Sequence, residues 1–277
     1  MKKFTFCSLV LAGSCLALAP LSGFASPKSA VVPLFDAPTG MFLGAVSGKT
    51  WLKAEKAAPL LPKTGISVAH YDAKKRLSFG FARPLQSMGA PCPETLQTEF
   101  APKTPGAAKF SLGRSATNIF PRRVRVENPQ SAVYRGIVTK ILRANGLGSP
   151  AQIQQIWRVD LEGDGVDEVL ISAARKVDYG DPERISAQVR AGDYAILMMR
   201  KIVNGQAKNI LLEASFHKKN IEFSAPSFNW LVAVFDANGD GKMEVLTSGA
   251  YYEGGWTELH ELQNNTLKSV LGAGCGA

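Results

Sequence analysis

The sequence predicts an α+β fold that is mainly antiparallel β-sheet, with one clear helix at about residues 130–144. Two patterns lead to this prediction. Short runs of alternating apolar and polar residues recur along the chain and are separated by turns rich in Gly, Asn and Asp. One segment instead repeats its apolar residues at helical spacing. Short turns between sequential strands favour antiparallel pairing, because parallel pairing needs a long crossover.

The first 25 residues are typical of a secretory signal peptide. Two lysines precede an apolar stretch, residues 4–21, and Gly23-Phe24-Ala25 supplies small residues for cleavage after Ala25. An uncleaved membrane anchor and a lipid-modified Cys15 are the alternatives. We expect export to the periplasm or the cell exterior, and no transmembrane segment in the mature chain.

Residues 26–125 form a predicted β-rich N-terminal region with long loops. This stretch is rich in Pro, Gly and Ala. Alternating apolar residues at 66–70 and 77–81 flank a predicted turn at 72–75, which is the pattern of a β-hairpin.

Residues 126–277 form a second predicted domain, which combines the helix with antiparallel β-sheet. Asn128-Pro129 is predicted to be the N-cap and first position of the helix, and Asn145-Gly146 to end it. Asn204-Gly205 predicts a tight hairpin turn between strands at 194–203 and 207–215. Further strands are predicted at 230–235, 243–251, 256–262 and 266–271.

The mature chain keeps two cysteines, Cys92 and Cys275. Two cysteines in an oxidising compartment most often pair. A bridge between them would tie the C-terminal tail to the N-terminal region, and in the chain-entropy model it would stabilise the fold by about 4 kcal/mol. Two free thiols are the alternative.

The signal peptide would remove two of the 32 basic residues and none of the 23 acidic ones, which leaves a net charge of +7. Such an excess favours anionic neighbours, although a solvated surface explains it equally simply. The densest basic run, residues 122–125, alternates like one face of a strand. We expect a glycan or an envelope protein as partner, and no nucleic acid.

The C-terminal half contains one acidic segment twice. Residues 160–172 and 236–248 share the pattern D-x-[E/N]-G-D-G-x-x-E-V-L-x-S. Calcium prefers roughly six to eight oxygen ligands in flexible geometry, and oxygen side chains in a tight glycine turn converge on one point. Two calcium sites are therefore predicted, and acidic β-turns without metal are the alternative. The first would use Asp160, Glu162, Asp164, the Val166 carbonyl and Glu168; the second would use Asp236, Asn238, Asp240, the Lys242 carbonyl and Glu244.

These segments resemble the calcium loops of FG-GAP and VCBS repeats, found in integrin-type β-propellers and bacterial surface proteins. The resemblance implies calcium held between two strands of one blade as structural support. Glu162 departs from the usual Asp or Asn, so the second site is expected to be the stronger. Only two such loops occur, whereas propellers have at least about four blades. A partial or irregular β-propeller is therefore the alternative fold.

Tyr252, Glu253 and Trp256, which follow the second loop, are the candidate ligand-binding residues. Aromatic rings beside glycines can stack on sugar rings, but a plain strand, turn and strand with core-facing rings explains the segment as well. The C-terminal half also resembles bacterial envelope proteins that carry Tyr-Tyr-Glu-Gly-Gly-Trp at this point, a resemblance that implies no activity.

No catalytic constellation stands out in the sequence. The three histidines lack metal-ligand spacing, and there is no G-x-S-x-G motif. The sequence therefore predicts an exported calcium-binding β-scaffold, a binding or structural module of the cell envelope. The alternative is a hydrolase acting on an envelope polymer, with acids near the loops as general acid and base.

Overall fold

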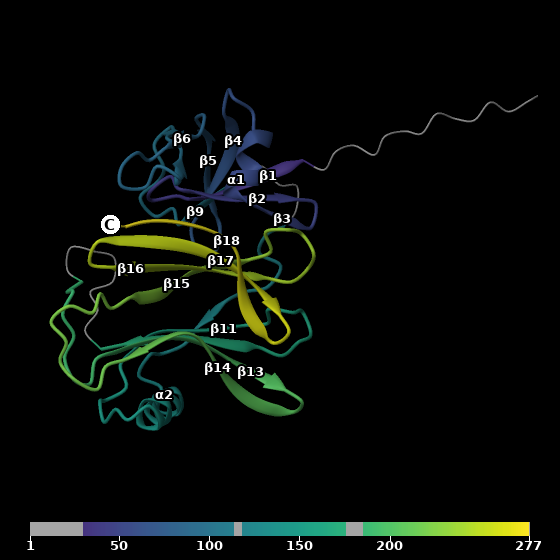
Figure 1. Ribbon diagram of the computed structural model, residues 1–277. Coiled ribbons are helices and arrows are strands. Elements are labelled where there is room, and N and C mark those ends of the chain that lie inside the picture. The colour runs from purple at the N-terminus through teal and green to yellow at the C-terminus, as the bar shows by residue number, and fades with distance from the viewer. Residues whose placement is uncertain (1–29, 114–117, 176–184, 277) are drawn as a thin grey trace, which may run out of the picture.

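The computed structural model describes residues 30–113, 118–175 and 185–276, so the predicted signal peptide lies outside the described residues. The described residues form three large antiparallel sheets and one two-stranded sheet, and none of them closes on itself (Figure 1). The mainly antiparallel prediction is confirmed. The α+β label with one helix is loose, because the described residues contain two α-helices, one of only four residues, among mostly β-strands.

The N-terminal sheet has seven strands in the order β3-β2-β1-β9-β4-β5-β8. Their bounds are β1 (Val31–Asp36), β2 (Phe42–Ser47), β3 (Thr50–Lys53), β4 (Ile66–Tyr71), β5 (Arg76–Ala82), β8 (Phe100–Ala101) and β9 (Phe110–Gly113). Beside it lie the short α1 (Ala54–Ala57), a 3₁₀ turn (Ala58–Leu60) and the pair β6 (Gln86–Ser87) and β7 (Leu96–Gln97). The predicted hairpin is β4–β5, and Asp72 closes its turn by accepting hydrogen bonds from the N–H groups of Lys74 and Lys75, each 2.7 Å long.

The other two large sheets follow each other along the chain. The second sheet contains β10 (Arg125–Val126), β11 (Ile153–Val159), β12 (Glu168–Ala174), β13 (Tyr194–Val203) and β14 (Gln206–Phe216), in that order. The third contains β15 (Phe228–Phe235), β16 (Glu244–Tyr251), β17 (Gly254–Gln263) and β18 (Thr266–Gly276), also in chain order. The predicted Asn204-Gly205 turn joins β13 to β14 with positive φ at both residues, as a two-residue hairpin requires.

The third sheet lies between the other two, as Figure 1 shows. Toward the N-terminal sheet, the ring of Phe235 stacks on Phe110 with centroids 4.1 Å apart. Toward the second sheet, the side-chain amide of Gln155 forms two hydrogen bonds with the backbone of Leu231, 2.7 and 2.9 Å long. Buried apolar residues fill both interfaces, so the three sheets form one stack.

Helix α2 (Ala132–Ala144) packs on the outer face of the second sheet. The predicted stop is confirmed: Asn145 ends the helix and Gly146 follows with a φ of 79°. The predicted N-cap is wrong, because Ser131 occupies that position. Asn128 instead accepts a 2.9 Å hydrogen bond from the N–H of Gln130, so Asn128-Pro129 forms a turn ahead of the helix.

Cys92 and Cys275 lie at disulfide distance, with Cα atoms 5.6 Å apart, and join a loop of the N-terminal region to the end of β18. Close by, the Thr95 hydroxyl donates a 2.7 Å hydrogen bond to the Gly274 carbonyl. The boundary near residue 125 stays a prediction. No described helix is long and apolar enough to cross a membrane.

His70 provides a test of the N-terminal core. It is buried on β4, its Nδ1 lies 2.7 Å from the Ser111 hydroxyl, and burial lowers its pKa. The folded state therefore takes up a proton on His70 at a lower pH than the unfolded chain, which does so below about pH 6.5. This contribution to stability is complete above that pH and is lost as the pH falls, with a slope of at most about 1.4 kcal/mol per pH unit.

We expect urea unfolding to show this loss between about pH 7 and pH 5.5, with a shallower slope in His70→Gln. The stability of His70→Gln is still expected to decrease somewhat as the pH falls, because burial also lowers the pKa of His260. Equal slopes in the two proteins would contradict the assignment.

Candidate metal site

The two acidic loops occupy the same place in their sheets. Residues 160–167 connect β11 to β12, and residues 236–243 connect β15 to β16. Each loop turns through two glycines with positive φ, Gly163 (79°) and Gly165 (85°) in the first, and Gly239 (70°) and Gly241 (90°) in the second. A side chain at these positions would strain the backbone. The shared glycines therefore give both loops one shape.

The first aspartate of each loop holds the turn together. Asp160 accepts hydrogen bonds from the N–H groups of Gly163 (2.6 Å) and Gly165 (2.9 Å). Asp236 accepts the equivalent bonds from Gly239 (2.6 Å) and Gly241 (3.0 Å). Such side-chain bonds to the next backbone N–H groups are a local turn device that needs no metal.

The closing glutamates, Glu168 and Glu244, are the first residues of β12 and β16. Their residues are 1% and 0% exposed. One carboxylate oxygen of each accepts a hydrogen bond from its own loop, from Leu161 N–H at 3.0 Å and from Ala237 N–H at 2.8 Å. The two glutamates thus close their loops in the same way.

The second oxygen distinguishes the two loops. In the first loop, Lys201 Nζ donates a 2.8 Å hydrogen bond to Glu168 Oε1 and also pairs with Glu162. In the second loop, Glu244 Oε1 is buried and has no hydrogen-bond partner. Burying a carboxylate without a partner costs several kcal/mol, so the second loop is the less satisfied of the two.

Negative charge accumulates around that oxygen. Burial raises the pKa of Glu244 to about 9; the N–H of Ala237 opposes this shift, and the charges of Asp240, Asp236 and Glu261 add to it. Within the described part of the chain, no basic side chain forms an ion pair with Glu244 or the two aspartates. Without a cation, Glu244 therefore holds a proton at neutral pH, and a cation bound at this loop would replace that proton.

The remaining predicted ligands of the second loop fit this environment unequally. Asn238 is buried, and its Nδ2 has no hydrogen-bond partner. Lys242 is exposed, so only its carbonyl would serve the site. As the side chains stand, no three His, Cys, Asp or Glu residues in the described ranges converge tightly enough to hold an ion. Binding would therefore require a local rearrangement around the free Glu244 oxygen.

The first loop is more open and lies among basic residues. Asp164 and Val166 are exposed, and the Asp164 carboxylate accepts a 2.9 Å hydrogen bond from the Val166 N–H. Next to them, Asp167 pairs with Arg125 and, at 3.4 Å, with Arg158. The surrounding side chains thus already compensate the acids of this loop.

Arg122 connects the two loops. Its guanidinium donates hydrogen bonds to the carbonyls of Asp160 (2.5 Å) and Leu161 (3.1 Å) in the first loop. It also donates a 2.8 Å bond to the carbonyl of Gly241 in the second. The sequence pattern around Arg122 predicts only a strand face, because nothing local shows that residues 122, 161 and 241 meet.

The three candidate ligand residues after the second loop do not form one site. Tyr252 packs edge-on against Phe223, with centroids 5.5 Å apart, and its hydrogen bond with the exposed Glu253 raises the pKa of Tyr252 to about 12. Trp256 faces glycines, Gly249 and Gly274, on both neighbouring strands. Trp256 also lines an open hollow of about 470 Å³, together with Lys53, Glu55, Glu258 and Ser269.

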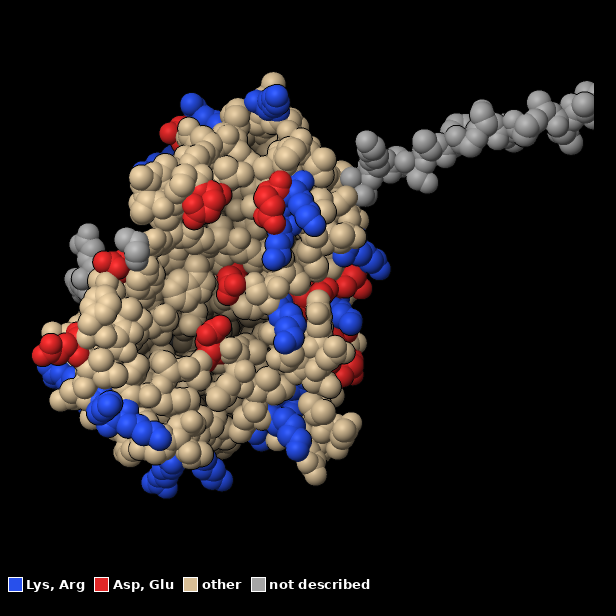
Figure 2. Space-filling view, viewed as in Figure 1, with Lys and Arg blue, Asp and Glu red and all other residues tan. Residues whose placement is uncertain are grey.

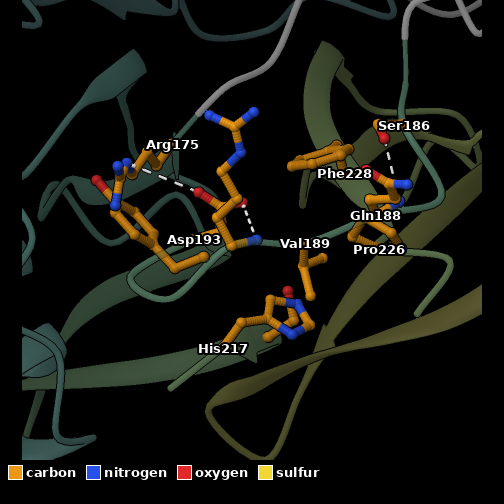
Figure 3. A pocket seen from close by; sticks show the side chains of 11 residues that line it. Arg175, Ser186, Gln188, Val189, Asp193, His217, Pro226 and Phe228 are labelled. Carbon is orange, nitrogen blue, oxygen red and sulfur yellow. Dashed lines mark hydrogen bonds and ion pairs between the residues drawn. The ribbon is translucent and has the colours of Figure 1, made fainter. Parts of the chain in front are cut away.

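A second hollow, of about 230 Å³, lies at the start of β13, at the end of this strand opposite Lys201 (Figure 3). The sequence did not predict this hollow. Asp193 accepts a hydrogen bond from the Arg190 N–H and pairs with Arg175 at 3.6 Å. His217 Nε2 and Ser215 Oγ are buried without a hydrogen-bond partner. These residues carry no spacing signal, because they are far apart in the chain and meet where the end of β12, the start of β13 and the end of β14 adjoin.

A hydrolase would require two carboxylates in one cleft. Glu213 on β14 comes nearest to this condition, because burial and then the charge of Glu258 raise its pKa. The two residues line different hollows. On the face shown in Figure 2, acidic side chains border a hollow near the centre of the view.

The chain matches no family model, and no curated protein or solved structure is detectably similar to it. The likeness to FG-GAP and VCBS loops therefore remains a prediction from the residues alone.

Arg122→Ala tests the connection between the loops. Three hydrogen bonds from a charged donor would be lost and the loop carbonyls left to water, so we expect a destabilisation of roughly 1.5 to 3 kcal/mol. Denaturant unfolding measures this loss. The matched control is Arg123→Ala, which removes an exposed neighbour and is expected to change stability by less than about 0.5 kcal/mol. Equal effects of both substitutions would contradict the connecting role.

Proposed function

We propose that this chain is an exported calcium-binding β-scaffold that serves as a binding or structural module of the cell envelope. One observation carries the proposal. The second loop buries the Glu244 carboxylate with an oxygen that has no partner, under the negative charges of Asp236, Asp240 and Glu261. A cation among these groups would satisfy the oxygen and remove their repulsion.

Calcium fits this donor set better than other common cations. The candidate ligands are carboxylate, amide and carbonyl oxygens, with no thiolate or imidazole among them. Hard oxygen donors favour calcium or magnesium over zinc and copper. The loop is a glycine turn with several conformers open to it, which suits the adaptable coordination of calcium more than the strict octahedron of magnesium.

The expected role of the ion is structural. The second loop bonds to two other segments: the Asp236 N–H donates to the Ile119 carbonyl, between β9 and β10, and the Met243 N–H donates to the Leu161 carbonyl of the first loop, both at 2.8 Å. Fixing the second loop would therefore also fix the alignment of the stacked sheets. Export, inferred from residues 1–25, would bring the site to compartments where calcium is abundant.

A glycan is the partner class that the exposed features suit best. Trp256 lines an open hollow together with two glutamates, a lysine and a serine. Flat aromatic surface with nearby hydrogen-bonding groups suits a sugar ring. A hydrolase of an envelope polymer stays the alternative, but Glu213 and Glu258 line different hollows and so do not supply its acid pair.

The calcium proposal is tested by thermal unfolding of the mature chain, residues 26–277, in calcium, in magnesium and in chelator. Millimolar calcium is expected to raise the midpoint by roughly 3 to 10 °C. Glu244→Gln keeps an oxygen for the Ala237 N–H but removes the charge. This variant is expected to lose the calcium response, and to be at least as stable as the wild type in chelator.

Glu168→Gln is the matched control, because it makes the same change in the first loop. The substitution removes the charged carboxylate that pairs with Lys201. The variant is therefore expected to be less stable than the wild type with and without calcium, and to keep the calcium response. If calcium and magnesium leave the wild-type midpoint unchanged, the loops are acidic turns and the calcium proposal fails.

The glycan proposal is tested by binding of the mature protein to an array of envelope glycans. Trp256→Ala is expected to weaken binding at least about tenfold, because stacking on the indole is lost. Tyr252→Ala is the control, since this ring packs against Phe223 away from the hollow and its loss is expected to leave affinity unchanged. Absence of binding by the wild type, or equal losses in both variants, would speak against this hollow as the glycan site.

A further inference from the structure

The sheet register places one side chain beside each closing glutamate. Val169 pairs with Arg200, so the next position across the sheet sets Lys201 beside Glu168. Val245 pairs with His260, so the same step sets Glu261 beside Glu244. Directly opposed residues of antiparallel strands point to the same face and lie about 5 Å apart at Cβ. The strand that follows each closing glutamate's own strand, β13 in the second sheet and β17 in the third, therefore places one residue beside that glutamate, and the two residues have opposite charge.

The strand beyond, β14 in the second sheet and β18 in the third, does not account for the difference in charge between the two loops. Lys201 pairs with Lys208 on β14, and Glu261 pairs with Lys268 on β18. Both of these lysines are exposed, and Lys208 donates a 2.9 Å hydrogen bond to Gln206 rather than to the loop. The two loops thus share their glycines, first aspartate, closing glutamate and outer lysine. Among the positions directly across the sheet from the closing glutamates, the residue on the adjacent strand, Lys201 on β13 or Glu261 on β17, is the one whose charge differs.

Lys201 occupies the first loop as a fixed cation. Its side chain is 5% exposed, and its ammonium contacts Glu168 and Glu162, which are positions nine and three of the loop. These are two of the oxygen donors that a calcium ion would use. A divalent ion in the same place would meet the repulsion of the buried ammonium and would have to displace it from both carboxylates.

Glu261 has the opposite effect at the second loop. It adds negative charge at Glu244 and a further carboxylate that the repeated motif does not contain. Among the described residues, the Glu261 carboxylate accepts one hydrogen bond, from the side-chain amide of Gln263. A carboxylate on the neighbouring strand gives the loop an extra hard-oxygen donor, which strengthens calcium binding by adding ligand charge.

We propose that the residue facing the closing glutamate sets the cation of each loop: Lys201 is a built-in cation that replaces metal in the first loop, and Glu261 is an additional ligand that recruits one calcium ion to the second. The proposal rests on the calcium-binding function proposed above. It predicts one calcium per chain, although the sequence contains two loops of the same pattern.

Exchanging the charges tests the proposal. Calcium bound per chain is counted by isothermal titration and equilibrium dialysis of the mature protein. We expect one ion for the wild type and none for Glu261→Lys, whose thermal midpoint in chelator should reach that of the calcium-loaded wild type. Lys201→Glu should bind two ions and depend on calcium to fold. Lys208→Glu, which changes an exposed lysine on the next strand, should still bind one.

Each outcome decides one claim. Two ions bound by the wild type, or one ion bound by Glu261→Lys with unchanged affinity, would overturn the assignment of Lys201 and Glu261 and leave the calcium function standing. No ion bound by the wild type would remove the calcium function itself. If Lys201→Glu does not fold even in calcium, Lys201→Met takes its place, and failure of calcium to restore its midpoint would contradict the proposal.

Discussion

A buried carboxylate at the start of a central strand is the constraint on which the C-terminal half depends. Glu168 and Glu244 close their loops by accepting a backbone N–H from the second loop residue, and both are shielded from water. A buried charge costs several kcal/mol unless a partner compensates it. The first loop has that partner in Lys201. We infer that the second loop takes its partner from solution, as a calcium ion.

The loops influence more than their own turns, because they lie where the layers meet. Arg122 joins the carbonyls of both loops, and Met243 bonds to Leu161 between them. The Gln155 amide joins the second sheet to the third, and the Cys92–Cys275 pair joins the third to the N-terminal region. Ordering of the second loop would therefore affect the contacts between all three stacked sheets.

Local signals were sufficient for some elements, such as β4–β5 and β13–β14, but not for the other strands of the N-terminal sheet or for the site. Asn204-Gly205 and Asn145-Gly146 were predictable because their backbone conformations are set by the residues themselves. The start of α2 was misplaced, because Asn128-Pro129 suits a turn as well as a cap. Lys201 was not predicted, because its contact with Glu168 spans 33 residues and depends on strand register. Glu261 was missed for the same reason.

The most direct measurement is a crystal structure of the mature protein grown in millimolar calcium, with anomalous scattering to identify the ion. The account predicts one calcium in the second loop, about 2.3 to 2.6 Å from oxygens that include Glu244 and Glu261. It also predicts that the Lys201 ammonium remains between Glu162 and Glu168 in the first loop. Calcium in both loops, or a second loop without metal in crystals soaked to saturation, would contradict it.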